Sequence, residues 1–363
     1  MAVTRITREL IDVGLIEEGV RTVRPDLSGR RPTELAIKKS GAYVLGLGIY
    51  AYEQSAVLMD LAGQVLRQCA LEPPPGRQNA ECLIDWTRQI RRELIRKDFD
   101  PLRVLGAGVA VAGNVDTEQG ILLEAPYLGW SRVDIAGLLK TQLNLPVVVS
   151  GTASALLSAA RRTFDGNLDN ALLFNVGFAI GGAFLIDGRV ARGDQLRAGQ
   201  IGHLPSTRGD RLCSCGQKGC LNALASGWAA LADLGEVDGR TNSAEEFRAS
   251  RTKLMRLLRR EAQGEPNACK ALRRAGQHLG RAASQLFVAL DTARVFLSGP
   301  VGLTSSFFAG VKDGFAPYDA AILERCDCKF DAAAALLALE QFVFSPRLDF
   351  DRLRQASALE EAA

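Results

Sequence analysis

The sequence lacks a strong excess of either charge and lacks a long apolar run. Its 44 basic and 41 acidic residues give a formal net charge of +3 over 363 residues. A chain with so small a net charge can bind nucleic acid only through a local basic patch. The longest charge-free stretches, 145–160 and 170–186, contain glycine and polar residues, so neither is typical of a membrane-spanning helix.

Other absences narrow the class of protein further. Arg5, Arg8 and Glu9 occupy the region where a signal peptide needs an apolar core, so we expect a cytoplasmic protein with no membrane partner. The 36 glycines and 13 prolines follow no period, which excludes a collagen-like chain. A hydrophobic content of 47% argues against disorder, and the length suits two or three domains.

The cysteines are the most informative feature of the sequence. A cytoplasmic protein rarely uses disulfides, so the eight cysteines need another explanation. His203, Cys213, Cys215 and Cys220 form a Cys₃His set of the kind that holds a tetrahedral Zn²⁺ ion. A disulfide within Cys-x-Cys would be strained, which favours a metal. Because no position of the set is obviously open, we predict a structural zinc; the alternative is three unrelated thiols.

Residues 1–39 differ from the rest of the chain. Val3, Ile6 and Leu10 recur at helical spacing and predict an amphipathic helix over 2–13. A short strand, a basic turn-rich segment at 21–32 and a second strand near 35–37 follow. This order is typical of the second half of a winged helix-turn-helix. Its first half would precede Met1, so we expect the native gene product to begin further upstream.

The basic side chains of this region are candidates for DNA contacts. Thr4, Arg5 and Arg8 lie on the face of the predicted helix opposite its apolar residues, where they could reach bases or phosphates. Arg30 and Arg31 lie in the basic loop and could enter a minor groove. The alternative is a solvated helix and loop with scattered charge.

From residue 43 onward the pattern is α/β and is repeated. We predict two β-β-β-α-β-α-β halves with a cleft between them, an actin/hexokinase-like (ribonuclease-H-like) fold of duplicated lobes. The first lobe would span 40–149 and include a C-terminal helix at about 331–345. The second would span 150–330. The predicted strands are 43–49, 54–60, 64–70, 104–111, 146–149, 170–177, 180–186, 189–192 and 294–298. The predicted helices are 78–96, 132–142, 153–162, 224–233, 243–262, 267–290, 303–314 and 332–343.

Two adjoining segments resemble the signature of the ROK family, which contains sugar-responsive repressors, open reading frames and sugar kinases. They are Gly199-Gln-Ile-Gly-His203 and Cys213-Ser-Cys-Gly-Gln-Lys-Gly-Cys220. Residues 1–39 resemble the end of the winged domain of the repressor branch. The resemblance places the cysteine set on the family's zinc site. It implies an operator DNA as partner, a homodimer or homotetramer, and oligomerisation helices in the second lobe.

The residues that match the family's kinase motifs depart from them. The first phosphate turn reads Gly48, Tyr50, Ala51 and Tyr52, without the family's aspartate. In the second, Phe178 replaces a threonine. Thr152 stands at the position of the general base, and a threonine hydroxyl cannot accept a proton near neutral pH. We therefore predict no kinase activity and no ATP binding.

The resemblance also implies a ligand pocket. Its members would be Gly151, Thr152, Gln200, His203 and Asn222, with neutral side chains where the family has carboxylates. We expect a small neutral or sugar-like effector, or none. The prediction is a ROK-family transcriptional regulator, a repressor with a catalytically degenerate sensor domain. The alternatives are a ROK sugar kinase acting on a hexose or amino sugar, and a pseudokinase that acts through protein contacts without binding DNA.

Overall fold

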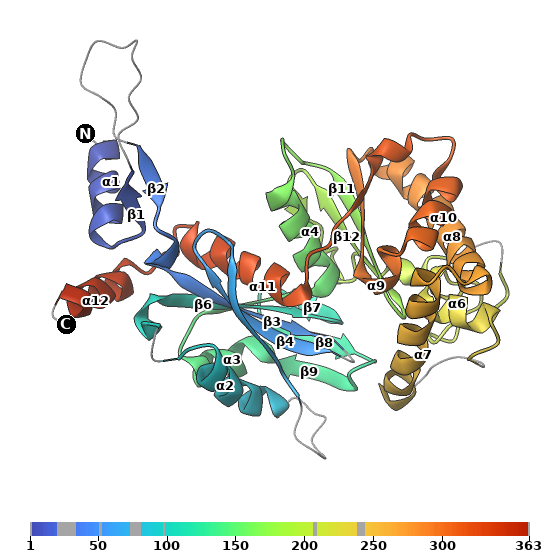
Figure 1. Ribbon diagram of the computed structural model, residues 1–363, viewed down its shortest axis with the longest axis horizontal. Coiled ribbons are helices and arrows are strands. Elements are labelled where there is room, and N and C mark those ends of the chain that lie inside the picture. Colours follow the sequence, from blue (N-terminus) through green and yellow to red (C-terminus); the bar gives the residue numbers. More distant parts are fainter. Residues whose placement is uncertain are drawn as a thin grey trace, which may run out of the picture.

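The computed structural model describes residues 2–19, 34–50, 53–72, 81–96, 99–205, 209–237 and 244–361. Two lobes, each built around a five-stranded sheet, lie side by side, and a small N-terminal unit projects from the first (Figure 1). The mixed α/β fold with two open sheets confirms the predicted fold class. No helix of the described chain is both long enough and apolar enough to cross a membrane.

The N-terminal unit is a helix followed by a two-stranded sheet. Helix α1 (Ala2–Asp12) leads into β1 (Ile16–Glu18), which pairs antiparallel with β2 (Leu35–Ile37). The predicted helix and both strands are therefore present. Arg30 and Arg31 lie outside the described residues. Their predicted contacts with DNA therefore stay a prediction.

A buried arginine fastens this unit to the first lobe. The guanidinium of Arg103 is 3% exposed and donates to the backbone oxygens of Val13, at 3.3 Å, and Gly41, at 2.9 Å. It also reaches the hydroxyl of Ser357, at 3.4 Å, on the C-terminal helix α12 (Phe350–Glu361). That helix was not predicted. Arg103 therefore joins the N-terminal unit, the first lobe and the C-terminus at one point.

The first lobe has the strand order β10-β6-β3-β4-β5. Helices α2 (Cys82–Glu93) and α3 (Ile135–Leu143) lie on one face of this sheet, and α11 (Phe330–Ala338) lies on the other (Figure 1). Successive side chains of β3 point to opposite faces of the sheet, as they do in any strand. The strands are β3 (Tyr43–Ile49), β4 (Gln54–Asp60), β5 (Val65–Ala70), β6 (Val104–Val111) and β10 (Val147–Gly151).

Helix α11 packs against the first sheet with its backbone unusually close. A Cβ atom on Gly46 would lie 2.1 Å from the backbone oxygen of Asp331, and one on Gly108 would lie 1.9 Å from that of Ala334. The Asp331 carboxylate is 1% exposed and accepts hydrogen bonds from Ser55, at 2.6 Å, and from the Gln68 side chain, at 2.7 Å. This helix continues into a π-helical turn (Leu339–Val343).

A small antiparallel sheet adjoins the first lobe and corrects one prediction. It has the order β7-β8-β9, from β7 (Asn114–Asp116), β8 (Ile121–Ala125) and β9 (Trp130–Asp134). The helix predicted at 132–142 was wrong at its start, because residues 132–134 belong to β9 and α3 begins at Ile135. Asp134 caps α3 by accepting from the Gly137 backbone N–H at 2.8 Å, which ends the strand there.

The second lobe repeats the strand order of the first. Its sheet runs β13-β12-β11-β14-β15, an antiparallel meander with two parallel strands added, as in β5-β4-β3-β6-β10. The predicted duplication is therefore confirmed. The strands are β11 (Ala171–Val176), β12 (Ile180–Ile186), β13 (Arg189–Val190), β14 (Arg294–Ser298) and β15 (Leu323–Arg325). The α-helices are α4 (Thr152–Thr163), α5 (Asn222–Ala225), α6 (Gly227–Asp233), α7 (Ala244–Ala262), α8 (Pro266–Leu290), α9 (Gly299–Gly302) and α10 (Ser305–Phe315).

The long helix α8 uses its apolar face within the chain. Leu272 and Leu279 are fully buried in the same cluster as Phe307 and Phe315 of α10. Helices α8 and α10 also run side by side in Figure 1. This face of α8 is therefore not available to a second copy of the chain, so an oligomer would have to use other surfaces.

We expect Gly46→Ala to lower the free energy of unfolding by about 2 kcal/mol or more, because the new Cβ meets the backbone of α11 rather than a movable side chain. Gly181→Ala on β12 is the matched control, since no atom lies within 4 Å of a Cβ there. Urea denaturation followed by circular dichroism compares the two variants. Equal midpoints for both would contradict the close packing of α11.

Candidate functional site

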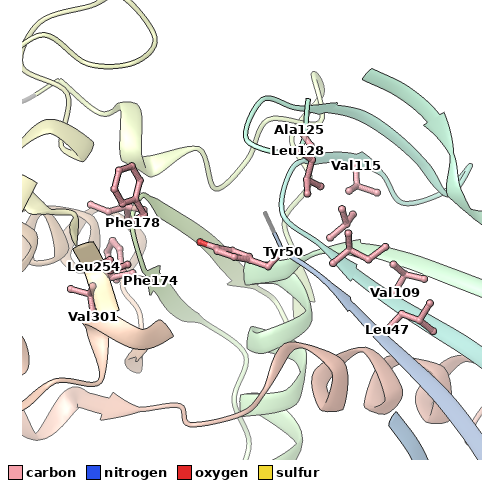
Figure 2. Packing of buried hydrophobic residues seen from close by; sticks show 14 of the residues in the cluster. Leu47, Tyr50, Val109, Val115, Ala125, Leu128, Phe174, Phe178, Leu254 and Val301 are labelled. Carbon is pink, nitrogen blue, oxygen red and sulfur yellow. The ribbon is translucent and has the colours of Figure 1, made fainter. Parts of the chain in front are cut away.

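A large cleft of about 1660 Å³ separates the two lobes. Its lining includes the ends of β10 and β11, the start of α4, and the loop that leads to the 3-10 turn η3 (Ile201–His203). Tyr50, which follows β3, lies between the two lobes in Figure 2. Its ring stacks on that of Phe330, with centroids 5.2 Å apart. Ala51 and Tyr52, which were matched to the first phosphate turn, lie outside the described residues.

Two buried side chains in the lining of the cleft each have one polar atom without a hydrogen-bond partner in the described part of the chain. Thr152, the first residue of α4, is 6% exposed, and Asn175, on β11, is 5% exposed. The hydroxyl oxygen of Thr152 and the Oδ1 atom of Asn175 accept or donate no hydrogen bond with any described residue. An unpaired buried polar atom carries a desolvation penalty, which a bound molecule with hydrogen-bonding groups would relieve. Both atoms are closed off from solvent, and a Cβ atom on Gly299 would lie 2.5 Å from Asn175 Oδ1, so this oxygen faces the start of α9.

The structure brings most of the predicted pocket residues to this cleft. Gly151, Thr152, Gln200 and His203 all line it, and so does Ser154. Gln200 is exposed and directly precedes η3. These residues come from the β10–α4 junction and from the segment 200–203, which contains η3, and the two segments are far apart in the sequence. The cleft therefore has a neutral polar surface where these two segments meet.

Asn222 lies beside the main cleft and not in its lining. Its Oδ1 accepts a hydrogen bond from the backbone N–H of Ile180 at 2.8 Å, which fixes the start of β12. With Tyr127 and Ser214 it lines a separate cavity of about 20 Å³, roughly the space of one water molecule. Burial raises the pKa of Tyr127 above its ordinary value, so the phenol stays neutral. Asn222 thus positions the start of β12 and does not itself line the cleft.

The segment that matches the second phosphate turn has an apolar role. Phe178 is 3% exposed and belongs to the same buried cluster as Phe174, Leu254 and Val301 (Figure 2). The backbone of residues 177–178 accepts hydrogen bonds from the N–H groups of Gly227 and Trp228 at the start of α6. This turn is therefore tied to the second-lobe core, and its Phe178 side chain offers no hydroxyl to a ligand.

Four candidate metal ligands converge at one edge of the cleft. The ligand atoms of His203, Cys213, Cys215 and Cys220 all lie within 4.8 Å of one another. The Sγ atoms of Cys215 and Cys220 are 3.6 Å apart, and His203 Nδ1 is 3.7 Å from Cys213 Sγ. Ligands at about 2.0–2.3 Å from a shared tetrahedral ion lie roughly 3.3–3.8 Å from one another. The Cys215–Cys220 and His203–Cys213 distances fall within this range, so these pairs are spaced as ligands of one ion would be.

The cluster also connects the cleft to the small sheet of the first lobe. Burial raises the pKa of Cys220 to about 12, so a dication would be needed to stabilise its thiolate. With Nδ1 facing the thiols, the other ring nitrogen of His203 is left to the cleft that this residue lines. Ser214, between two of the cysteines, lies 3.5 Å from the hydroxyl of Tyr127.

The candidate DNA-contacting residues of α1 are accessible. Thr4, Arg5 and Arg8 are all exposed, and neither arginine forms an ion pair with a described residue. The apolar face of α1 is partly uncovered as well, because Val3 is 78% and Ile6 50% exposed. Glu9 instead pairs with Arg354 of α12 at 2.7 Å. Helix α1 is thus attached to α12 through Glu9, while part of its apolar face stays exposed.

The model of the ROK family matches residues 45–336. The chain belongs to the ROK family. Among solved structures it is similar to a ROK family transcriptional regulator described as a homologue of the E. coli MLC protein, with a TM-score of 0.70 and 23% identity over 99% of this chain and 91% of that one. A ROK family glucokinase from Streptomyces griseus, in complex with glucose and AMPPNP, has a TM-score of 0.65 and 21% identity over 82% and 100%. Both likenesses concern the fold.

Curated relatives of this ROK protein include regulators and kinases. A xylose repressor from Caldicellulosiruptor bescii is 28% identical over 231 residues, 63% of this chain and 57% of that protein. An N-acetylmannosamine kinase from Shigella flexneri is 26% identical over 281 residues, 74% and 87% of the two chains. The chain thus spans somewhat over half the length of the xylose repressors that it matches.

Sequence reasoning missed two groups of residues in the cleft of this ROK protein. Asn175 sits in an uninterrupted buried strand, where only its polarity among apolar neighbours could have singled it out. The arginines of the loop at 189–197 also line the cleft, although no motif includes them. Their position depends on the hairpin of β12 and β13, whose turn at Gly188 accepts a hydrogen bond from Arg161 near the end of α4.

We expect the purified chain to carry about one equivalent of a divalent metal and Cys220→Ser to carry less than about half, because a tetrahedral site with three ligands binds far more weakly. Cys269→Ser is the control, since that thiol lies on α8 away from the cluster. Elemental analysis of dialysed protein measures the content. Equal content in both variants would contradict the assignment of the ligands.

Proposed function

We propose that this chain is a ROK-family transcriptional regulator, acting as a repressor whose kinase-like domain senses a small molecule without phosphorylating it. The observation that carries the proposal is Thr152, which stands uncharged and unpartnered where the cleft would need a general base. The likeness to xylose repressors and to a solved ROK regulator supports it. The small effector would bind between the lobes.

The N-terminal unit would contact operator DNA. Its exposed helix α1 carries two arginines without ion-pair partners among the described residues, which suits phosphate or base contacts. Arg103 and α12 hold this unit against the first lobe. A change in the angle between the lobes would therefore alter the placement of α1 in a homodimer or homotetramer.

We propose that the metal is a structural Zn²⁺ ion. Three thiols and one imidazole are the ligand set that zinc prefers, and the spacing of the four atoms suits a tetrahedron. Bound there, zinc would fix the loop that carries Ser214 and orient the His203 ring. No reaction step is assigned to it.

A second candidate function is sugar phosphorylation, which the likeness to an N-acetylmannosamine kinase favours. Two features oppose it. Phe178 is buried in an apolar cluster where a phosphate turn would be needed, and Thr152 cannot take the proton of a sugar hydroxyl. We therefore assign no phosphoryl transfer to this chain. A pseudokinase that acts only through protein contacts is a further alternative, and the DNA experiment below separates it from the regulator.

We expect Arg5→Ala combined with Arg8→Ala to weaken operator binding by about tenfold or more and to reduce its salt dependence by about two counterions, because two phosphate or base contacts are lost. The operator is selected from host genomic DNA with protein purified from the native host. Arg256→Ala with Arg259→Ala, two exposed residues of α7, is the matched control. Unchanged affinity in the α1 variant would contradict α1 as the reading helix, and no selected DNA would favour the pseudokinase.

We expect no turnover above about 0.1 per second in a coupled ATP assay over hexoses and amino sugars, a value low against typical enzyme rates. Thr152→Asp should remain inactive too, because Phe178 still leaves the second turn without a hydroxyl donor. A ROK glucokinase run in parallel is the positive control. Faster turnover by the unaltered chain would establish the kinase instead.

A further inference from the structure

The small sheet of the first lobe carries a side chain at each of its two turns that contacts the second lobe. This sheet, β7-β8-β9, lies on the side of the first lobe that faces the second (Figure 1). Glu118 lies in the turn between β7 and β8, and Tyr127 lies in the turn between β8 and β9. The two turns are at opposite ends of β8, a strand of 5 residues, so they are roughly 17 Å apart. The sheet therefore reaches the second lobe at two separate points.

The first point is an ion pair across the cleft. Glu118 accepts a hydrogen bond from Arg192, in the loop that follows β13, at 2.6 Å. The turn itself is fixed, because the Asp116 carboxylate accepts from the backbone N–H groups of Glu118 and Gln119, both at 3.1 Å. The side chains of Glu118 and Arg192 are 78% and 50% exposed, so solvent and salt screen their attraction. This contact alone holds the lobes weakly.

The second point lies deeper and does not depend on charge. The Tyr127 hydroxyl lies 3.5 Å from the Ser214 hydroxyl, and it also shares a hydrogen bond with the Asn222 side chain. Ser214 belongs to the loop that carries the cysteines, and Asn222 is the first residue of α5, so both partners are second-lobe residues. Tyr127 and Ser214 line both the main cleft and the small cavity beside Asn222. Together they form part of the wall between these two spaces.

The turn that carries Tyr127 is anchored in the first lobe by the next residue. Leu128 is 8% exposed and lies in the buried cluster with Val115 and Ala125 (Figure 2). The backbone N–H groups of Leu128 and Gly129 both donate to the Ala125 oxygen at 3.0 Å, which closes the turn. Leu128 therefore fixes the turn to the first lobe while Tyr127 reaches the second. Separation of the lobes has to pull Tyr127 away from its partners.

We propose that the small sheet is a clasp that holds the two lobes together across the cleft, with Tyr127 as its buried end and Glu118 as its exposed end. Opening of the lobes then requires Tyr127 to leave Ser214 and Asn222. This movement joins the small cavity to the cleft and exposes Trp228 of α6, which lines that cavity. The inference goes beyond the proposed function, because the clasp would hold the lobes of a pseudokinase in the same way.

Small-angle X-ray scattering and fluorine NMR of the full chain test the proposal. Scattering measures the radius of gyration, which rises as the lobes separate. Incorporation of 5-fluorotryptophan gives one signal for each of the 3 tryptophans, and the shift of a signal between H₂O and D₂O measures its solvent exposure. Trp86 is buried in the first lobe and reports whether that lobe stays folded. Trp228 reports the cavity beside Tyr127.

We expect Tyr127→Ala to raise both the radius of gyration and the solvent shift of Trp228, with the solvent shift of Trp86 unchanged. Tyr127→Phe, which removes the hydroxyl group alone, should produce the same changes to a smaller degree. Tyr318→Phe is the matched control and should change neither value, because Tyr318 is 40% exposed and lies after α10, away from the small sheet. Glu118→Gln should have a small effect alone and add to that of Tyr127→Ala.

An unchanged radius of gyration in Tyr127→Ala combined with Glu118→Gln would overturn the clasp. A rise in the exposure of Trp228 without a change in scattering would overturn it too, because removal of the Tyr127 ring would then have opened a local cavity only. If Trp86 becomes exposed in the alanine variant, the comparison of Tyr127→Phe with its control decides. None of these outcomes depends on DNA binding, which the operator experiment measures separately.

Discussion

The contact between the backbone of α11 and the first sheet is the constraint on which the rest of the structure depends. Gly46 and Gly108 let the helix lie where any side chain would collide, and the buried Asp331 carboxylate bonds its first turn to β4 and β5. The same helix touches α4, which begins at Thr152 in the cleft. The first sheet, helix α11 and the start of α4 at the cleft are thus packed against one another.

Two contacts at opposite ends of this arrangement bear on the proposed sensor role. At the cleft, Thr152 presents a hydroxyl group and Gln200 an amide, and His203 belongs to the candidate metal cluster. At the other end, the buried guanidinium of Arg103 fixes the N-terminal unit to the first lobe through backbone oxygens. Removing the partners of a buried charge is costly, so α1 has to follow the lobe.

Much of this architecture could be predicted from the sequence, for identifiable reasons. The buried strands of both sheets are short apolar runs with turn residues at their ends, and the repeated order of elements indicated duplicated lobes. The cysteine spacing indicated the cluster at 203–220. The start of α3 was misplaced because Arg132 to Asp134 have no strand signal of their own; they pair with β8 only in the folded chain. Asn175, the cleft arginines and the side position of Asn222 depend on contacts between distant segments, which no local pattern contains.

The most direct test of the account is the distribution of the protein on the chromosome of its own host, measured by crosslinking and sequencing of the bound DNA. A regulator that reads DNA through α1 predicts a small set of discrete sites near promoters, and loss of these sites when Arg5 and Arg8 are both replaced by alanine. A folded, abundant protein with no enriched site would contradict the account. The two lobes would then serve a function away from DNA.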